Sequence, residues 1–496
     1  MAQRVPEAPA RRLVLVSDAL LACAALAALA AVALVALVHL TDNYHLDHVA
    51  GAWMGLAAYA NDGTLYPPLY ADGVFGGTRY MPLGIGLNAA GAAISGEHIV
   101  SGKLIALLTV AALLATVYVH ARRQNCERAV ALGTVGAVIA TFTALFAATS
   151  IYGDALALTL QLAAVTAVAS GTSRRMAILA GVLVALAFAA KLSALWGAAT
   201  VLVWLLIHDR RRLPAFLAAA AGTVLVALVS AELLSDGRFH ENVLALGGDA
   251  DIGRLVSDTP RKVFDLLLDH APGTLLLAPF ALLVVAVNAV QRRLAIVDVA
   301  LVAATFVTVA IMTDVGVGFN HLLDLVVLVP LAVACGYAGL GRSPLRLLLV
   351  AALTAATAVS LFDVRHDVRE AAAIAVHRNT PDRLRTPALD VRLAEPVLSE
   401  DPVIPVERGE TPIVLDSYML LRVLRRHPIW RRELVARIAR REFGTVVLVT
   451  DLDLDDPWWS ESHLGIEVAS EIHRQYRFAR KVPGPVFAYR LYVPRR

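Results

Sequence analysis

The stretch TDNYHLDHVAGAWMGLAAYANDGTLYPPLYADGVFGGTRYMPL, residues 41–83, directly follows the first long apolar segment of the chain. It holds four aspartates, two histidines, five tyrosines and a Pro-Pro pair. Elsewhere the chain avoids charge, since only 17% of its 496 residues are charged and 58% are apolar. Tyr and Trp suit the headgroup layer of a membrane, so this stretch is typical of a functional loop at a membrane surface.

Long runs of Ala, Leu and Val recur as far as residue 362. A bilayer core needs about 20 apolar residues per helix. The sequence therefore predicts a polytopic α-helical membrane domain over residues 1–362, with about eleven transmembrane helices. The predicted spans are 13–40, 99–120, 128–148, 153–170, 176–190, 193–207, 214–235, 271–290, 294–312, 319–340 and 344–362.

The distribution of Arg and Lys predicts the orientation of these spans. Basic residues cluster at 4–12, 122–128, 174–175, 210–212, 292–293 and 342–346. The positive-inside rule places such clusters in the cytoplasm, and all of them share one side only if the short, Gly-rich run 81–96 does not cross. We expect 81–96 to lie in the interface of a cell inner (plasma) membrane or only to dip into it, with a cytoplasmic N-terminus. Residues 41–98, 236–270 and 363–496 are then outside.

The chain changes character at residue 363, where charge and proline replace the long apolar runs. The tail predicts a soluble extracytoplasmic α/β domain over 363–496. We expect strands at 411–416 and 443–450, helices at 417–441 and 461–474, and two closing strands in YRFARKV and VFAYRLYV.

Several kinds of site are absent from the sequence. The three cysteines are far apart and form no CxxC or Cys/His ligand spacing, which argues against a disulfide framework and a zinc site. The net charge of +3 is too small to indicate nucleic acid as a partner. No Gly-rich nucleotide-binding loop is present.

Two residues of the first external loop are candidates for chemistry. Asp47 begins the helical pattern DHVAGAWMGLAAYAN, whose apolar face is expected to lie on the membrane. It is either a general base for an acceptor hydroxyl or a helix-start aspartate favoured by the helix dipole. Arg79 is the only Arg or Lys between Arg12 and Lys103, and it either binds a lipid phosphate or snorkels to the interface.

Later spans add further polar candidates. Asp154 opens the fourth predicted span, and Lys191 in LAFAAKLSALW either binds an anion or snorkels. His321 and Asp324 share a helical face, where they are functional or a polar pair that fixes helix packing. In the predicted topology Asp154, Lys191 and His321 gather at the outer surface with Asp47 and Arg79, which predicts a pocket there. Asp324 lies one helical turn deeper.

The order of these features resembles the polytopic glycosyltransferases of the GT-C superfamily, especially its protein-mannosyltransferase-like and aminoarabinose-transferase-like bacterial members. The shared features are an Asp-bearing juxtamembrane helix, a Tyr-Pro-Pro turn, and a basic-aromatic-x-Pro start to a half-embedded helix. An Asp at the start of a later span, LAFAAK and GFNHLLDL follow. The resemblance covers about residues 12–362.

The resemblance implies transfer of a sugar, hexosyl or pentosyl, from a polyprenyl-phosphate donor to a protein, lipid or polysaccharide acceptor at the outer face, with inversion. It implies catalysis by Asp47 and donor-phosphate contacts from Arg79, Tyr80 and Lys191. It places Asp154 at the acceptor or at a divalent cation. His48, His321 and Asp324 are further candidates for the acceptor or its pocket, and the ligands of any metal stay open. Relatives have an Asp-Glu pair where this chain has Asp47-His48, and Asp42 is the alternative acid. Aminoarabinose-type relatives have Glu-Lys-Pro-Pro where this chain has Thr-Arg-Tyr-Met-Pro at 78–82, so this chain lacks the acid of that motif.

Two other functions fit a polytopic protein. A transporter or lipid flippase would place intramembrane charges along a pathway and show inverted repeats. No clear repeat is visible in the sequence, and the acids cluster at one surface, which favours the transferase. A membrane assembly protein without catalytic activity, working through its external domain, is the third interpretation.

Overall fold

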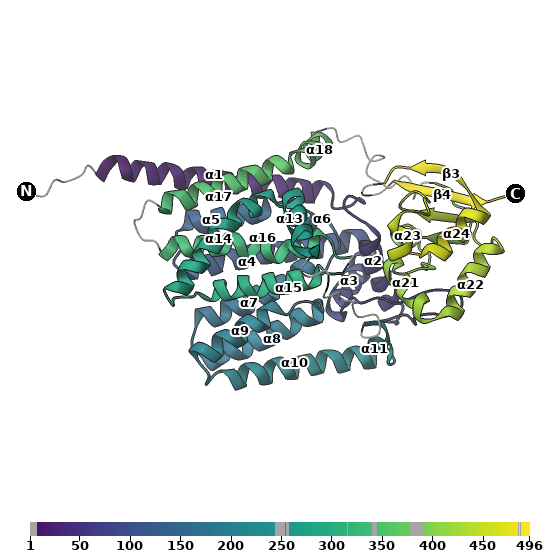
Figure 1. Cartoon of the computed structure of the whole chain (residues 1–496), viewed down its shortest axis with the longest axis horizontal. Helices are drawn as coiled ribbons and strands as arrows, with labels where there is room; N and C mark the ends of the chain where they lie inside the picture. The colour runs from purple at the N-terminus through teal and green to yellow at the C-terminus, as the bar shows by residue number, and fades with distance from the viewer. Residues whose placement is uncertain are drawn as a thin grey trace, which may run out of the picture.

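The structure is a computed structural model that describes residues 7–243, 253, 257–314, 316–339, 345–376, 391–484, 486 and 488–496. Parts of the basic clusters 4–12 and 342–346, of the outer segment 236–270, and of the predicted closing strand VFAYRLYV lie outside the described residues. Long helices run side by side, and a small mixed domain sits at one end of the bundle (Figure 1). Helix α1 (Glu7–Val38) starts at the opposite end (Figure 1).

Each predicted span contains a helix. By length and composition, six described helices suffice to cross a membrane, or seven if α5 and α6, which are bent by 75°, form one span. The polytopic helical fold is therefore confirmed, whereas the count of eleven crossings stays a prediction. The bundle consists of α1 (Glu7–Val38), α4 (His98–Arg123), α5 (Arg128–Ile139), α6 (Phe142–Thr149), α7 (Asp154–Ser170), α8 (Arg174–Ala190), α9 (Trp196–His208), α10 (Leu213–Leu234), α14 (Pro272–Val290), α15 (Ile296–Ile311), η1 (Phe319–Leu322), α16 (Leu323–Gly339) and α17 (Leu345–Asp363).

Small residues and lipid-facing leucines explain how these helices assemble. A Cβ atom at Gly136 of α5 would lie 2.6 Å from the Cα atom of Ala25, so glycine is what allows α1 and α5 to approach closely. At the edge of the bundle, α10 exposes Leu225 and Leu233 by 63% and 74%. Such an apolar surface is stable against lipid rather than water.

Short helices lie at the end of the bundle that faces the C-terminal domain (Figure 1). The segments between the spans form α11 (Arg238–Val243) and α13 (Thr259–His270), and α18 (Arg365–Val376) follows α17. The hydroxyl of Tyr44 donates to Asp367 of α18 at 2.5 Å, which ties this helix to the loop after α1.

The first loop, which follows α1, forms α2 (His48–Asn61) and α3 (Pro82–Ser95), which lie between the bundle and the C-terminal domain (Figure 1). The predicted helix at 81–96 is present and starts at its proline. Helix α2 differs from its expected place on the membrane, because residues 50–57 are all buried. A Cβ atom at Gly51 would lie 2.5 Å from the backbone nitrogen of Val403, so α20 (Val403–Glu407) of the C-terminal domain covers α2.

The C-terminal domain has a four-stranded sheet in the order β1-β2-β4-β3. Strands β1 and β2 are parallel, and the other pairs are antiparallel. The predicted strand at 443–450 and the first closing strand are present. The elements are β1 (Val397–Ser399), β2 (Thr445–Leu448), β3 (Tyr476–Val482), β4 (Tyr489–Pro494), α21 (Ser417–Arg426), α22 (Pro428–Ala439), α23 (Pro457–Glu461) and α24 (Ile466–Gln475).

Two expectations for this domain were wrong. The helix predicted at 417–441 is two helices, because Pro428 lacks the backbone N–H that would continue the first one. Residues 411–416 are not a strand of the sheet. Instead Phe75 of the first loop donates its backbone N–H to Ile413 at 2.7 Å, and Leu415 donates to Phe75 at 3.0 Å. The partner of this segment therefore comes from the far end of the sequence.

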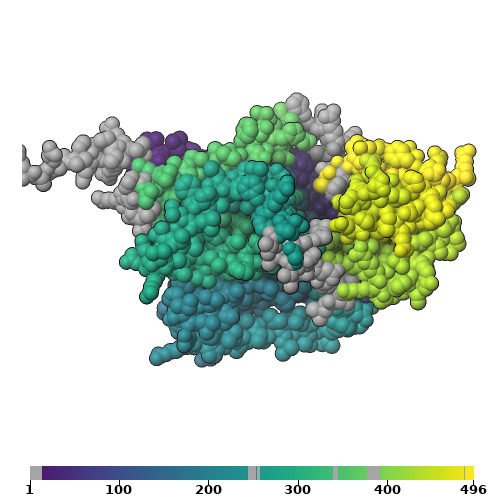
Figure 2. Space-filling model, viewed as in Figure 1, coloured from purple at the N-terminus to yellow at the C-terminus, as the bar shows by residue number. Residues whose placement is uncertain are grey.

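The first loop and the C-terminal domain are thus packed as one outer layer. The side chain of Phe75 is 1% exposed and belongs to the core of the C-terminal domain. In the space-filling view the C-terminal residues close directly on the end of the bundle (Figure 2). Residues from both ends of the chain therefore contribute to the region that the sequence marked as functional.

Candidate functional site

Asp47 caps the N-terminus of α2 and also faces outward from it. Its Oδ1 accepts hydrogen bonds from the backbone nitrogens of Val49 and Ala50, at 3.0 and 3.1 Å. Its Oδ2 accepts a hydrogen bond from the hydroxyl of Tyr152 at 2.7 Å. Both interpretations from the sequence are therefore compatible, since one oxygen holds the helix start and the other is directed away from the helix.

Asp42, the alternative acid, has a different environment. It is 3% exposed and contacts His39 Nδ1 at 2.6 Å and Lys103 Nζ at 3.4 Å, and it accepts from the backbone nitrogen of Tyr44 at 2.8 Å. Burial opposes its ionisation, but the hydrogen bond with His39 and the charge of Lys103 lower the pKa of Asp42 overall. Asp42 therefore joins α1 to α4, whereas Asp47 is partly exposed.

Three residues predicted from separate spans come together at the start of α7. Asp154 pairs with Lys191, and its two oxygens accept from Asn320 Nδ2 at 3.3 Å each. Lys191 Nζ also lies 3.0 Å from His321 Nδ1. Asp324 accepts from the indole nitrogen of Trp196 at 3.0 Å. These side chains line a charged pocket formed by Asp154, Ala157, Leu158, Gln161, Lys191, Ser193, Ala194, Asn320, His321, Leu323 and Asp324.

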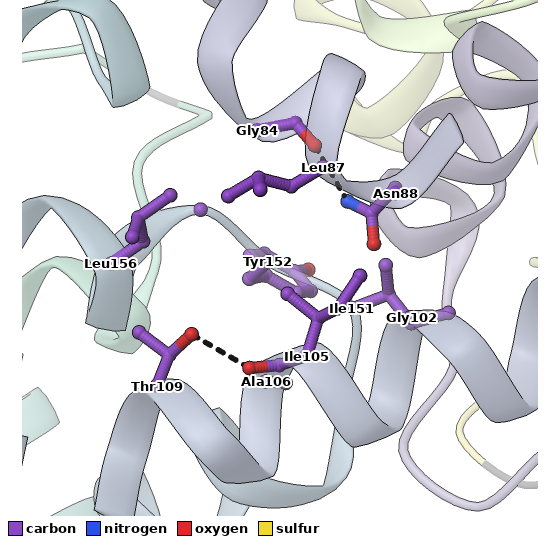
Figure 3. A pocket seen from close by; sticks show the side chains of 11 residues that line it. Gly84, Leu87, Asn88, Gly102, Ile105, Ala106, Thr109, Ile151, Tyr152 and Leu156 are labelled. Atoms are coloured by element: carbon purple, nitrogen blue, oxygen red, sulfur yellow. Dashed lines mark hydrogen bonds between the residues drawn. The ribbon is translucent and has the colours of Figure 1, made fainter. Parts of the chain in front are cut away.

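A second pocket, which is largely apolar, lies between α3, α4 and the start of α7. Figure 3 shows Leu87 and Asn88 on one side of it and Ile105 and Thr109 on the opposite side, with Tyr152 between them. This apolar pocket is lined by Gly84, Leu87, Asn88, Gly102, Ile105, Ala106, Thr109, Ile151, Tyr152, Gly153 and Leu156.

The start of α7 separates the two pockets. Tyr152 and Gly153 line the apolar pocket, and Asp154 lines the charged one. Because Tyr152 donates to Asp47, the carboxylate of Asp47 is attached at the boundary between them. An apolar pocket thus lies beside a charged one, with the start of α7 between them.

Tyr80 lies near this boundary, within reach of the charges of Asp47 and Asp154. Its ring stacks on Trp53 of α2, with 4.7 Å between the ring centroids. Burial raises the pKa of its phenol well above the ordinary value, and neighbouring carboxylates reinforce this effect against the charge of Arg79. Those carboxylates are Asp416, Asp47 and Asp154.

Arg79 points toward the C-terminal domain. Its guanidinium lies 3.0 Å from Asp314 Oδ2, and Arg422 of α21 lies 3.0 Å from the same oxygen. The other oxygen of Asp314 accepts from the hydroxyl of Tyr418 at 2.6 Å. We call Arg79, Asp314, Tyr418 and Arg422 the Asp314 cluster. It joins the first loop, the segment before η1 and the C-terminal domain.

Acid should weaken this cluster. Burial opposes ionisation of Asp314, but the hydrogen bond from Tyr418 and the charge of Arg79 outweigh it and lower its pKa from 3.8 to about 2. A carboxylate whose pKa is lower in the folded than in the unfolded protein stabilises the fold at every pH above its unfolded-state pKa. That stabilisation is lost as the pH falls through the folded-state pKa. From pH 4 to pH 2 we expect the unaltered protein to lose about 2 kcal/mol more of unfolding free energy than Asp314→Asn does. Unfolding followed against pH measures this difference, and parallel curves for the two proteins would contradict it.

His48 lies away from both pockets. Its ring meets that of His463 edge-on, with centroids 5.0 Å apart. His463 Nδ1 in turn lies 2.8 Å from the buried carboxylate of Glu400. His48 is therefore placed at the contact of α2 with the C-terminal domain, and it lines neither the charged nor the apolar pocket.

Sequence reasoning missed five polar residues of this region. Tyr152 and Asn320 adjoin the predicted Asp154 and His321, so their neighbourhood was a usable signal. Asp314, Tyr418 and Arg422 carried no such signal, because only the folded chain brings α21 to the first loop. Within the described part of the chain, no group of three His, Cys, Asp or Glu side chains is arranged to hold a metal ion.

Comparison with known families gives a partial match. Residues 91–246 match the sequence profile of Glycosyltransferase family 87. This stretch includes Asp154 and Lys191 but precedes His321 and follows Asp47 and Arg79. A search by sequence among curated proteins found no match.

Solved structures resemble almost the whole chain. ArnT from Cupriavidus metallidurans bound to undecaprenyl phosphate is 12% identical, with a TM-score of 0.56. The match covers 94% of this chain and 97% of that one. The apo oligosaccharyltransferase of Archaeoglobus fulgidus is 11% identical, with a TM-score of 0.56, and 95% of this chain covers 74% of it. AglB from the same organism, in complex with an inhibitory peptide and a dolichol-phosphate, is 12% identical, with a TM-score of 0.51 and the same coverage.

At these identities the likeness establishes the fold. It extends over the bundle and the C-terminal domain, and the family profile points to the same kind of protein. The chain is thus a multi-pass membrane protein with the fold of the GT-C superfamily of glycosyltransferases.

Proposed function

We propose that the protein is a glycosyltransferase that moves a sugar from a polyprenyl-phosphate donor to an acceptor at the outer face of the membrane. The observation that carries this proposal is the boundary at the start of α7. There an apolar pocket, a charged pocket and the carboxylate of Asp47 meet through Tyr152 and Asp154. The family profile over 91–246 supports glycosyl transfer, and similar folds bind undecaprenyl phosphate and dolichol-phosphate.

The two pockets match the two parts of such a donor. The polyprenyl chain would enter between α3 and α4, where Leu87 and Ile105 line the apolar pocket. Its phosphate would then lie near the cations of Lys191 and Arg79. Arg79 would bind the charge that the phosphate already carries in the donor, whereas Lys191, in a site of low dielectric, would stabilise the charge that grows on the phosphate as it leaves. The phenol of Tyr80, stacked on Trp53, would donate a hydrogen bond to the same group.

The chemical step is a single displacement. The acceptor hydroxyl attacks the anomeric carbon of the sugar while the bond from that carbon to the phosphate oxygen breaks. Asp47 takes the proton of the hydroxyl, and the polyprenyl phosphate leaves with the bonding electrons. One displacement inverts the anomeric centre. No part of this step is assigned to a metal ion.

The proposal requires the site to lie outside the cytoplasm. In the predicted topology the basic clusters stay inside, so the outer ends of the spans carry Asp154 and Lys191. The acceptor is then a protein, lipid or polysaccharide of the cell envelope. Glycan mass spectrometry of a strain lacking the protein tests this. We expect one sugar substituent to disappear and to return with the unaltered protein but not with Asp47→Asn, and an unchanged envelope would refute the proposal.

Arg79→Ala should raise the KM for the donor about 10-fold, because the lost contact is a charge-assisted one to phosphate. The kcat should change little, since the acceptor and its base are not altered. Initial rates with purified protein in liposomes and a labelled polyprenyl-phosphate sugar measure both quantities. Arg238→Ala, which removes an exposed pair with Asp236, is the control. An unchanged donor KM would exclude a phosphate contact from Arg79.

A further inference from the structure

Asp314 holds two cations that come from opposite ends of the chain. The guanidinium groups of Arg79 and Arg422 each lie 3.0 Å from its Oδ2. Both also face the ring of Tyr418, at 5.3 and 5.4 Å from its centroid. Two like charges placed this close repel each other, and here one carboxylate lies between them. The position of each guanidinium therefore depends on Asp314.

The segment that carries Asp314 is itself held in place. Lys262 of α13 donates to the carbonyl oxygens of Met312 and Asp314, at 3.3 and 3.0 Å. The backbone nitrogen of Gly316 donates to the hydroxyl of Tyr418 at 3.2 Å. This segment leads directly into η1, which carries Asn320 and His321 of the charged pocket. Asp314 is thus fixed relative to the charged pocket on one side and to α21 on the other.

We propose that Asp314 is a positioning residue, which fixes the Arg79 guanidinium for the donor and makes the C-terminal domain part of the donor site. The C-terminal domain contributes through Tyr418, which donates to Oδ1 of Asp314, and through Arg422, which contacts Oδ2 together with Arg79. This inference rests on the proposed function, because it concerns the phosphate contact assigned to Arg79. It gives the C-terminal domain a role in donor binding, besides any role in recognising the acceptor.

Burial makes this arrangement stiff. The side chains of Asp314 and Arg422 are each only 12% exposed, and that of Arg79 is 26% exposed. Charge-assisted hydrogen bonds are stronger when water is excluded from them. Arg79 is the most exposed cation of the cluster, so it is the one that remains accessible to a ligand.

The test compares donor KM and kcat for Asp314→Asn, Arg79→Ala and the double variant in the full-length protein. We expect Asp314→Asn to raise the donor KM about 10-fold and to change kcat less than about 2-fold. In the Arg79→Ala background, Asp314→Asn should raise the donor KM no further, because it acts through Arg79. An unchanged KM in Asp314→Asn, or effects that multiply in the double variant, would overturn the inference.

Two further variants separate positioning from folding. Tyr418→Phe removes the hydrogen bond to Asp314 Oδ1, together with the weaker ones that the hydroxyl accepts from Gly316 N and Arg422, and it keeps the ring. It should raise the donor KM about 3-fold in a protein that stays folded. Arg425→Ala alters the exposed side of the same helix, where Arg425 bonds the carbonyl of Ser460, and it should leave KM unchanged. If Asp314→Asn does not fold, Tyr418→Phe alone decides, and an unchanged KM there overturns the inference. Absence of transfer by the unaltered protein would instead overturn the proposed function and this inference with it.

Discussion

Asp47→Asn should lower kcat for sugar transfer about 1,000-fold, while the donor KM stays within a few-fold of that of the unaltered protein. Asparagine keeps an oxygen that can accept from the backbone nitrogens of Val49 and Ala50, so the cap of α2 is retained. What the change removes is the negative charge and the proton-accepting oxygen that faces Tyr152. Loss of activity without loss of stability is therefore the signature of a base. Initial rates together with the melting temperature measure it.

Two matched changes show whether the effect belongs to Asp47. Asp62→Asn alters the exposed residue at the other end of α2 and should leave both kcat and stability unchanged. Asp42→Asn alters the alternative acid, which is bonded to His39 and Lys103. It should lower the melting temperature, whereas kcat of the protein that remains folded should change little. If Asp42→Asn abolishes transfer in a stable protein and Asp47→Asn does not, the assignment of the base is reversed.

The membrane bundle was largely predictable because its signal is local. Apolar runs of suitable length predict helices directly, and each predicted span does contain one. Asp154, Lys191 and His321 lie at the ends of three predicted spans, and the structure brings them together. The ends of neighbouring helices on one side of a bundle lie close together. The predicted spans alone therefore indicated that these three side chains would meet.

The contacts of the first loop were not predictable in the same way. Phe75 pairs with Ile413, and Arg79 pairs with Asp314 and faces Tyr418, over separations of hundreds of residues. Nothing in the pattern of 411–416 says that its partner lies in the first loop rather than in its own sheet. Helix α2 reads as amphipathic, yet Gly51 and Gly55 allow α20 and Leu415 to cover it. Only the fold decides between lipid and protein as the cover for such a face.

The second large loss of activity is expected from changes to the pair of Asp154 and Lys191. Asp154→Asn or Lys191→Met should each lower kcat/KM about 100-fold, since either change leaves one charge of the pair without its partner in the charged pocket. A purely structural pair would recover activity in the double variant, because two neutral side chains restore the balance of charge. We expect the double variant to recover its melting temperature but not its activity, as Lys191 is then missing from the phosphate.

A matched pair at the opposite end of the bundle serves as the control for this result. Arg346 pairs with Glu127 there, so Glu127→Gln with Arg346→Met removes an ion pair far from both pockets. We expect this variant to keep its kcat/KM within about 2-fold. The decisive quantity is the activity of Asp154→Asn with Lys191→Met relative to its stability. Recovery of both together would assign the pair to helix packing, whereas stable protein without transfer assigns the pair to the site, because only a role in ligand binding or catalysis leaves the two properties uncoupled.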